Sequence, residues 1–209
     1  MIRSIARHAA ALVLSAFFAL PAAAEYRLSD KDKADVARIE AYLNNIETLK
    51  SPFVQLASGG RFAEGTIYIE RPRRIRLDYK PPATVQVYAK GNWLLHVDTE
   101  LETVTHIPIS STPVGFLVGD KTRFSGQVEV HRVVREKQTI SVVLGETDAP
   151  EAGSFTLTFS DNPLQLRRWT VVDAQGVTTN VTLVGAAFNV AIPPGVFAFD
   201  ETKYERELQ

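Results

Sequence analysis

The side chains best suited to binding a metal are two histidines and an aspartate in mid-chain. His96 and Asp98 stand two residues apart, and His106 follows after the polar stretch 99–102. If that stretch is a four-residue turn between antiparallel strands, residue 98 lies opposite 103 and residue 96 opposite 105. The two histidines then point to opposite faces of the sheet, whereas a metal needs them together. We therefore predict no metal site.

Other catalytic patterns are missing from the sequence as well. Ser110 and Ser111 lack the G-x-S-x-G context of a serine hydrolase, and there is no paired-carboxylate or phosphate-loop motif. The chain has no Cys, so the fold must be held by its core alone, and no Cys can carry a lipid after an export signal. We predict a protein that is not an enzyme and needs no cofactor.

The arginines between residues 71 and 76 permit two interpretations. The guanidinium of Arg71 offers several donors for helix-terminal carbonyls, but an Arg at a strand end is usually solvated and weakly paired. The neighbouring Arg73, Arg74 and Arg76 can form a positive rim that faces a partner or anionic lipid. They can equally be a solvated edge that discourages strand pairing.

The first 24 residues have the pattern of a cleavable secretory signal. Arg3 and Arg7 precede an apolar run from Ala9 to Leu20, and alanines 22–24 suit a signal peptidase. Removal of this segment leaves one predicted domain, 25–209, with 21 basic and 24 acidic side chains and a formal charge of −3. We expect a soluble periplasmic protein, and the charge argues against nucleic-acid binding.

The mature chain begins with a predicted amphipathic helix over 29–50. Ser29 and Asp32 have the spacing of a capping box, and Ser51-Pro52 is expected to end the helix. One stripe is apolar, which predicts that the helix lies on an apolar surface: Val36, Ile39, Leu43, Ile46 and Leu49. The opposite face is polar: Asp35, Arg38, Glu40, Asn44 and Glu47.

Beyond the helix, the apolar residues recur with period 2, as in short antiparallel strands with one apolar face. The predicted strands are 66–71, 74–80, 84–89, 92–98, 103–109, 127–135, 138–144, 154–160, 165–173 and 177–184. Residues 110–121 interrupt them as a short apolar helix or lid segment. We predict a mostly β, α+β fold in which a sheet of about ten strands curls around amphipathic helices. Patterning alone leaves open whether the concave face encloses a cavity or a filled core.

Several motifs, in the same order, resemble the LolA family of periplasmic lipoprotein carriers over residues 30–200. They are Phe53-Val54-Gln55, Gly65 to Pro72, Arg76 to Pro82, Lys90 to Leu94 followed by Asp98, Thr112-Pro113, and Val172-Asp173 to Gly176. The tail departs from the family pattern, because Phe199-Asp200 runs into a charged ending at 202–207.

The resemblance implies an incomplete antiparallel β-barrel that a lid of short helices closes over a hydrophobic cavity. It also implies that Arg71 latches the lid by hydrogen-bonding to lid backbone. The expected cargo is an acylated lipoprotein, received from an inner-membrane lipoprotein-releasing ABC transporter and passed to the outer membrane, with or without a receptor there. We expect a monomer that touches membranes only transiently.

A carrier of this kind must hide hydrocarbon from water. Burial of a methylene is worth about 0.8 kcal/mol, so a sixteen-carbon chain represents roughly 12 kcal/mol. The inward-facing residues of the predicted strands and lid are the candidate lining: Ile67, Ile69, Ile75, Leu77, Tyr79, Val85, Val87, Trp93, Leu95, Val97, Phe116 and Leu117.

Two other functions fit the same half-barrel. One is a module that senses envelope stress by binding a membrane-anchored anti-sigma factor, although such proteins usually carry a second domain. The other is a carrier of a different lipid, such as a glycolipid or isoprenoid, since Ile and Leu do not distinguish one acyl chain from another.

Overall fold

The structure is a computed structural model that describes residues 26–109, 112, 114–126, 128–200, 202 and 204, without the side chains at 114, 116 and 150. The predicted signal segment 1–24 and three residues at the predicted start of the lid helix, Ser110, Ser111 and Pro113, lie outside the described residues.

Helix α1 spans Asp30–Asn44 and begins at the predicted capping box. The Asp32 N–H donates to Ser29 Oγ (3.2 Å), and the Ser29 N–H donates back to Asp32 Oδ2 (2.9 Å). Two unsatisfied donors of the first turn thereby gain partners. The predicted apolar stripe is buried at Ile39 and Leu43.

The predicted end of this helix was wrong. Helix α1 ends at Asn44 rather than at residue 50, and Ser51 and Pro52 lie inside a strand, β1, which starts at Thr48. Ile46 and Leu49 continue the helical spacing only by coincidence, because Leu49 alternates with Ser51 and Phe53 as strand residues do. Pro52 lies where β11 ends, and its carbonyl accepts the Val184 N–H (2.9 Å).

The strands form a single antiparallel sheet, in which ten strands overlap the predicted segments and the strands over 48–57 and 187–188 were not predicted. Its strands are β1 Thr48–Ala57, β2 Phe62–Glu70, β3 Arg74–Tyr79, β4 Val85–Lys90, β5 Trp93–Asp98, β6 Thr103–Pro108, β7 Val128–Arg135, β8 Thr139–Glu146, β9 Gly153–Ser160, β10 Gln165–Asp173, β11 Thr178–Leu183 and β12 Ala187–Phe188. The spatial order is β6-β5-β4-β3-β2-β1-β11-β10-β9-β8-β7, with β12 paired to β1. The sheet is therefore open, with β6 and β7 at its edges.

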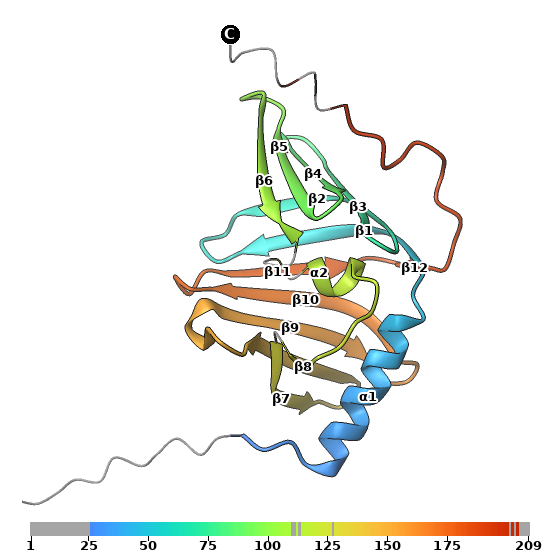
Figure 1. Ribbon diagram of the computed structural model, residues 1–209, viewed down its shortest axis with the longest axis vertical. Coiled ribbons are helices and arrows are strands. Elements are labelled where there is room, and N and C mark those ends of the chain that lie inside the picture. The colour runs from blue at the N-terminus through green and yellow to red at the C-terminus, as the bar shows by residue number, and fades with distance from the viewer. Residues whose placement is uncertain are drawn as a thin grey trace, which may run out of the picture.

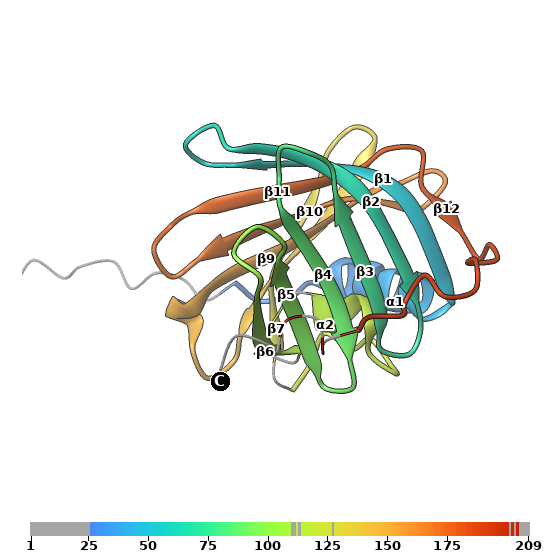
Figure 2. The same ribbon diagram turned by 90° about the horizontal axis from the view of Figure 1, so that it is seen from above.

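The sheet curls strongly, so that β3–β6 run steeply across the direction of β7–β11 (Figures 1 and 2). Helix α1 and the short helix α2, Val114–Val118, lie within the curve. A 3-10 turn, η2, spans Pro150–Ala152. Among the described residues, no helix has the length and apolar character needed to cross a bilayer.

One large apolar cluster fills the concave side and includes both helices. Ile39 and Leu43 of α1 and Leu117 and Val118 of α2 join inward side chains from both halves of the sheet. Continuous apolar contact of this kind stabilises the curl, since each half covers the other.

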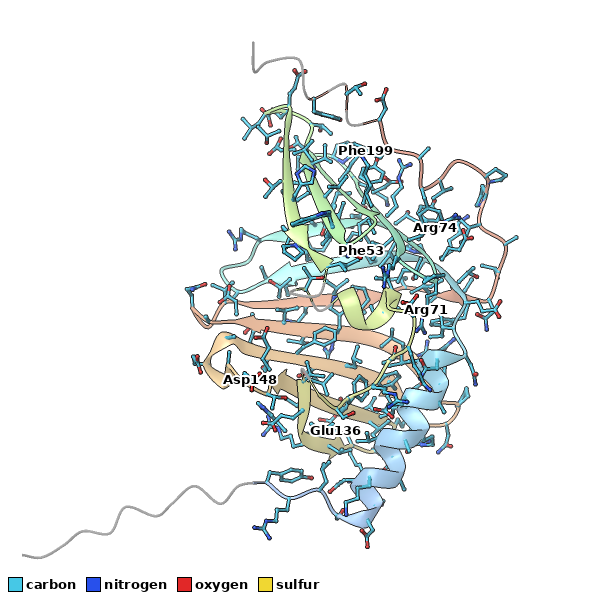
Figure 3. The ribbon with its side chains drawn as sticks, in the orientation of Figure 1. Phe53, Arg71, Arg74, Glu136, Asp148 and Phe199 are labelled. Carbon is cyan, nitrogen blue, oxygen red and sulfur yellow. The ribbon has the colours of Figure 1, made fainter. Side chains whose placement is uncertain are left out.

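A smaller apolar cluster lies on the outer face of β4–β6. Tyr88, Leu95 and Val97 are buried there, and Phe199 stacks on Tyr88 with ring centroids 4.6 Å apart. The C-terminal segment that carries Phe199 runs along the outside of the sheet (Figures 1 and 3). The outer face of this half is thus covered as well.

Ion pairs tie the polar face of α1 to the strands. Arg135 of β7 contacts Asp32 (2.8 Å) and Asp35 (2.7 Å), and Arg38 contacts Asp161 after β9 (2.7 Å). These bonds hold α1 against the edge strand β7 and place charge where another strand would otherwise pair.

Asp32→Ala is expected to lower the midpoint of thermal unfolding. The Ser29 hydroxyl and N–H, with Arg135 and Tyr26, hold the pKa of the Asp32 carboxyl well below its usual value. The folded protein therefore binds this proton less tightly than the unfolded chain. The resulting stability is present above the ordinary carboxyl pKa of about 3.9 and is lost as the pH falls below it.

Circular dichroism at neutral and acidic pH measures this effect. Asp30→Ala is the matched control, because Asp30 is in the same helical turn and pairs only with the exposed Lys33. Equal midpoints for the two variants at neutral pH would contradict the assigned role.

Candidate functional site

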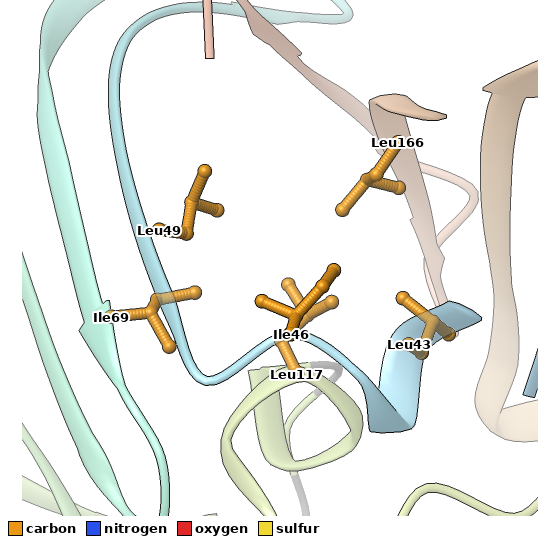
Figure 4. Close-up of a pocket in the computed structure, with 6 residues that line it drawn as sticks. All are labelled: Leu43, Ile46, Leu49, Ile69, Leu117 and Leu166. Carbon is orange, nitrogen blue, oxygen red and sulfur yellow. The ribbon is translucent and has the colours of Figure 1, made fainter. Parts of the chain in front are cut away.

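The candidate site is the apolar surface beneath α2. Figure 4 shows a small cavity where α1, α2 and the sheet meet, with six aliphatic side chains around it: Leu43, Ile46, Leu49, Ile69, Leu117 and Leu166. Its volume is about 10 Å³. That volume holds roughly one water molecule.

This cavity is therefore much smaller than the hollow expected for a bound acyl chain. The described side chains fill the concave side, and a hydrocarbon chain can enter only if some of them move. Leu117 is the lining residue that belongs to α2, so displacement of α2 would expose the cavity to solvent.

Most of the predicted lining residues lie where they were expected, on the concave side. Two of them, Ile69 and Leu117, border the cavity itself. The others either are buried in the same cluster or pack against it: Ile67, Ile75, Leu77, Val87, Tyr79 and Val85. The side chain of Phe116 lies outside the described residues.

The assignment of the faces of β5 was wrong. Leu95 and Val97 belong to the outer cluster, and Trp93, which has the same parity, is 46% exposed. The register places Leu95 opposite Tyr88, so Leu94 and His96 are the residues that face inward. Alternation could not decide the face here, because both faces carry apolar residues and both are covered.

Sequence patterning missed four of the six residues around the cavity. Leu43, Ile46 and Leu49 were recognised as an apolar stripe but were assigned to a helix lying on the sheet rather than to the site. Leu166 was included in a strand without a role. Their apolar spacing was visible, but their convergence depends on where α1 ends.

Arg71 joins the C-terminal ends of both helices (Figure 3). Its Nη1 donates to the Leu43 carbonyl of α1 (2.6 Å), and its Nε and Nη2 donate to the Gly119 carbonyl just after α2 (3.0 and 2.6 Å). These carbonyls belong to helix ends that lack intrahelical donors. The bonds that the family resemblance implied for Arg71 are therefore present.

The Arg71 guanidinium is partly desolvated where it lies. Burial lowers its pKa, and the nearby Asp120 carboxylate opposes that shift. A guanidinium remains protonated despite such a shift. The carbonyl ends of two helices are the partial negative charges that stabilise it.

Further bonds attach the end of α2 to the turn between strands β2 and β3. The Arg73 N–H donates to the Val118 carbonyl (2.7 Å), and its guanidinium pairs with Asp120 (3.0 Å). Arg74 pairs with Glu70 and Arg76 with Asp78, both on the sheet. The arginines of this region therefore each have a partner, and Arg71 and Arg73 are the two that reach the lid.

The chain that follows α2 is fastened to α1 by side chains that the sequence suggested were solvated. Asn44 donates to the Thr122 carbonyl (3.0 Å) and accepts the Thr122 N–H (2.8 Å). Glu40 accepts the Phe124 N–H (2.6 Å). Spacing of four residues on α1 was the available signal, since it places both side chains on one helix face.

A polar pair lies within the apolar concave face. The Tyr79 hydroxyl donates to Gln55 Oε1 (2.8 Å). The Phe53 ring packs edge-on against the Tyr79 ring, with the two ring centroids 5.1 Å apart. Burial raises the pKa of Tyr79 to about 12. The hydroxyl is therefore a neutral donor throughout the physiological pH range.

The predicted register around the two histidines is confirmed. Asp98 lies opposite Thr103 and His96 opposite Thr105, so His96 and His106 are on different faces. His106 packs edge-on against Trp93 on the outer side. Within the described residues, no three metal-ligating side chains gather at one place.

Comparison with known proteins gives consistent matches. The family model described as outer membrane lipoprotein carrier protein LolA matches residues 44–200. An outer-membrane lipoprotein carrier protein of Pseudomonas entomophila is 28% identical over 184 residues, which cover 82% of this chain and 86% of the relative. An uncharacterized protein of Rickettsia prowazekii is 22% identical over 144 residues, which cover 69% of this chain and 67% of the relative.

Solved structures of similar fold include a LolA superfamily protein from Nitrosomonas europaea. It is 12% identical, covers 78% of this chain and 97% of its own, and superposes with a TM-score of 0.42.

Arg71→Leu is expected to loosen α2 while leaving the sheet intact. Hydrogen bonds from a charged donor contribute about 1.5–3 kcal/mol each, so their loss favours opening. The Gly119 amide reports on the helix, because it donates to the Gly115 carbonyl (2.9 Å). Its hydrogen exchange should accelerate by about tenfold or more.

Arg74→Leu is the control for this change, since the ion pair of Arg74 is with Glu70 on the sheet and not with the lid. Unchanged exchange at Gly119 in Arg71→Leu, or an equal acceleration in Arg74→Leu, would refute the latch.

Proposed function

The chain belongs to the family of the outer membrane lipoprotein carrier protein LolA, and from this premise we propose that it is a periplasmic carrier of acylated lipoproteins. The acyl chains bind on the apolar concave face beneath α2. The protein receives them from an inner-membrane ABC transporter and delivers them to the outer membrane.

The observation that carries this proposal is the short helix α2, which covers the apolar concave face. A five-residue helix lies over an apolar surface, and its last carbonyls are held by Arg71 and Arg73. An ordinary core does not need a cover of this kind. A carrier does, because it must hide an apolar surface when empty and expose that surface to cargo.

Opening becomes favourable when cargo replaces α2 on the sheet. A sixteen-carbon chain contributes roughly 12 kcal/mol on burial, and a lipoprotein carries more than one chain. Displacement of α2 sacrifices contacts of Leu117 and Val118 and a few hydrogen bonds. The hydrocarbon therefore outweighs the lid, while the lid keeps the net affinity low enough for release.

The proposed cellular route is supported by the predicted signal segment and by the family. A signal segment at residues 1–24 directs export to the periplasm, where a protein of negative formal charge acts as a soluble monomer between the membranes. The lipoprotein-releasing ABC transporter is the donor, and the outer membrane, with or without a receptor, is the acceptor.

Acyl binding is tested with a fluorescent fatty-acid probe. The wild-type protein is expected to bind the probe saturably, and palmitate should displace it. Leu117→Asp should strengthen binding by about tenfold or more, because a buried charge disfavours the packing of α2 on the apolar face and so weakens the cover that competes with the probe. Titration of probe fluorescence gives the affinities.

Leu101→Asp is the matched control for this substitution, since Leu101 is 70% exposed on a distant turn. If wild-type protein shows no saturable binding, the carrier function is wrong. Equal affinities of the two variants would place the acyl site away from α2.

The shuttling step is tested with spheroplasts or with inner-membrane vesicles that contain the ABC transporter. Addition of the mature protein and ATP should release newly made lipoproteins into the soluble fraction as a one-to-one complex. Arg71→Leu is expected to accept lipoprotein but to transfer it poorly, because an open lid removes the competition that returns cargo.

Native mass spectrometry of the soluble fraction identifies the cargo. A complex with an acylated protein supports the proposal. A complex with a glycolipid or isoprenoid alone would instead identify the protein as a carrier of that lipid, and release independent of ATP would exclude the transporter as donor.

A further inference from the structure

The hairpin of β1 and β2 carries two large apolar side chains in solvent at its tip. Leu56 is 49% exposed and Phe62 is 62% exposed, and the two residues lie directly opposite each other in the strand register. Side chains at directly opposite positions lie on the same face of the sheet. They therefore form one apolar patch rather than two scattered residues.

This patch faces away from the core. Phe53 and Ala57 of β1 are buried on the concave side, so Leu56, of opposite parity, points outward. Strand β3 pairs with β2 only as far as Gly65, so Phe62 lies beyond the neighbouring strand. In Figure 2 this end of the hairpin projects from the body of the molecule.

The charge beside the patch is positive. Arg61 is exposed in the adjoining turn and forms no ion pair with any described residue. Glu64, the nearest acidic residue on the same strand, is neutralised by Lys80 (2.9 Å). An apolar pair with one free cation is complementary to the interface of a bilayer that contains anionic lipid.

We infer that the β1–β2 tip, defined here as Leu56, Arg61 and Phe62, inserts into the surface of an anionic lipid bilayer. Leu56 and Phe62 enter the boundary between headgroups and acyl chains, and Arg61 pairs with a lipid phosphate. The contact is small, so binding is weak and reversible, as suits a protein that leaves the membrane after each visit.

The position of the tip indicates a role for the membrane contact in lipid transfer. This role rests on the proposed carrier function. Gln55 precedes Leu56 in β1, and its side chain lies on the concave face with Tyr79. When the tip enters a bilayer, this end of the concave face is brought next to the lipid. An acyl chain that passes between the bilayer and the concave face is then exposed to water only over a short distance.

A fluorophore at the tip tests the contact directly. The chain has no Cys, so Ser58→Cys in the hairpin turn can be labelled at a single site with an environment-sensitive dye. Leu101→Cys, in the β5–β6 turn at the top of Figure 1, provides the matched label. Vesicles of phosphatidylethanolamine and phosphatidylglycerol should shift the emission of the first label to the blue and leave the second unchanged.

Substitution of the patch tests which residues are needed. The double variant Leu56→Ser, Phe62→Ser should float with these vesicles at least about tenfold less than wild type, and Arg61→Gln should lose the preference for vesicles with anionic lipid. Leu101→Ser should float like wild type, although Leu101 is more exposed than either tip residue. All of these side chains are exposed, and circular dichroism confirms that each variant folds.

Several results would overturn the inference. These are no flotation of wild-type protein, equal flotation of the double variant, or equal blue shifts at both labels. Sedimentation velocity tests whether a second copy of the chain binds the patch instead of a bilayer. A wild-type dimer that is absent in the double variant would show that it does.

The inference and the carrier function fail separately. The double variant should bind the fluorescent fatty acid as wild type does, because the patch is on the outer face. Loss of acyl binding by wild-type protein would refute the carrier function and leave the flotation result standing. Normal acyl binding with unchanged flotation of the double variant would refute the tip contact alone.

Discussion

The closed arrangement of the two helices depends on one guanidinium, which satisfies carbonyls at the ends of both. Helices α1 and α2 both end against the β2–β3 turn, and Arg71 donates to Leu43 of one and Gly119 of the other. Without this donor, the two carbonyls would lose charge-assisted partners in a partly buried place. The same residue therefore both completes the closed fold and marks where that fold can open.

The two helices are held by different forces, so they are not equally free to move. Helix α1 has a capping box, ion pairs to β7 and the turn after β9, and bonds from Glu40 and Asn44. Helix α2 has five residues, too few for an isolated helix to persist in water. Once its contacts are lost, α2 unfolds instead of swinging as a rigid lid. In the proposed carrier, opening is therefore expected to be a local order-to-disorder transition around a fixed α1.

Local sequence signals predicted most of the fold. The Ser29–Asp32 cap, the register beside the turn at 99–102 and the hairpin before Thr178 depend on residues close in sequence, and all three are present. The failures involve distant partners. The face of β5 is decided by the C-terminal Phe199, more than a hundred residues away, and Glu40 finds its partner at Phe124. Periodicity contains no information about either contact.

The packed interior also explains why patterning alone could not reveal a binding site. A protein that left a large apolar hollow open to water would lose the contacts that stabilise it, and its exposed surface would promote aggregation. The empty carrier avoids both by folding Leu117 against Ile46 and Ile69, so that its binding surface has the composition of an ordinary core. The proposed binding surface differs from an ordinary core in how the residue that covers it is held. Leu117 belongs to a segment fastened by hydrogen bonds to an arginine, which can exchange for water when hydrocarbon takes its place.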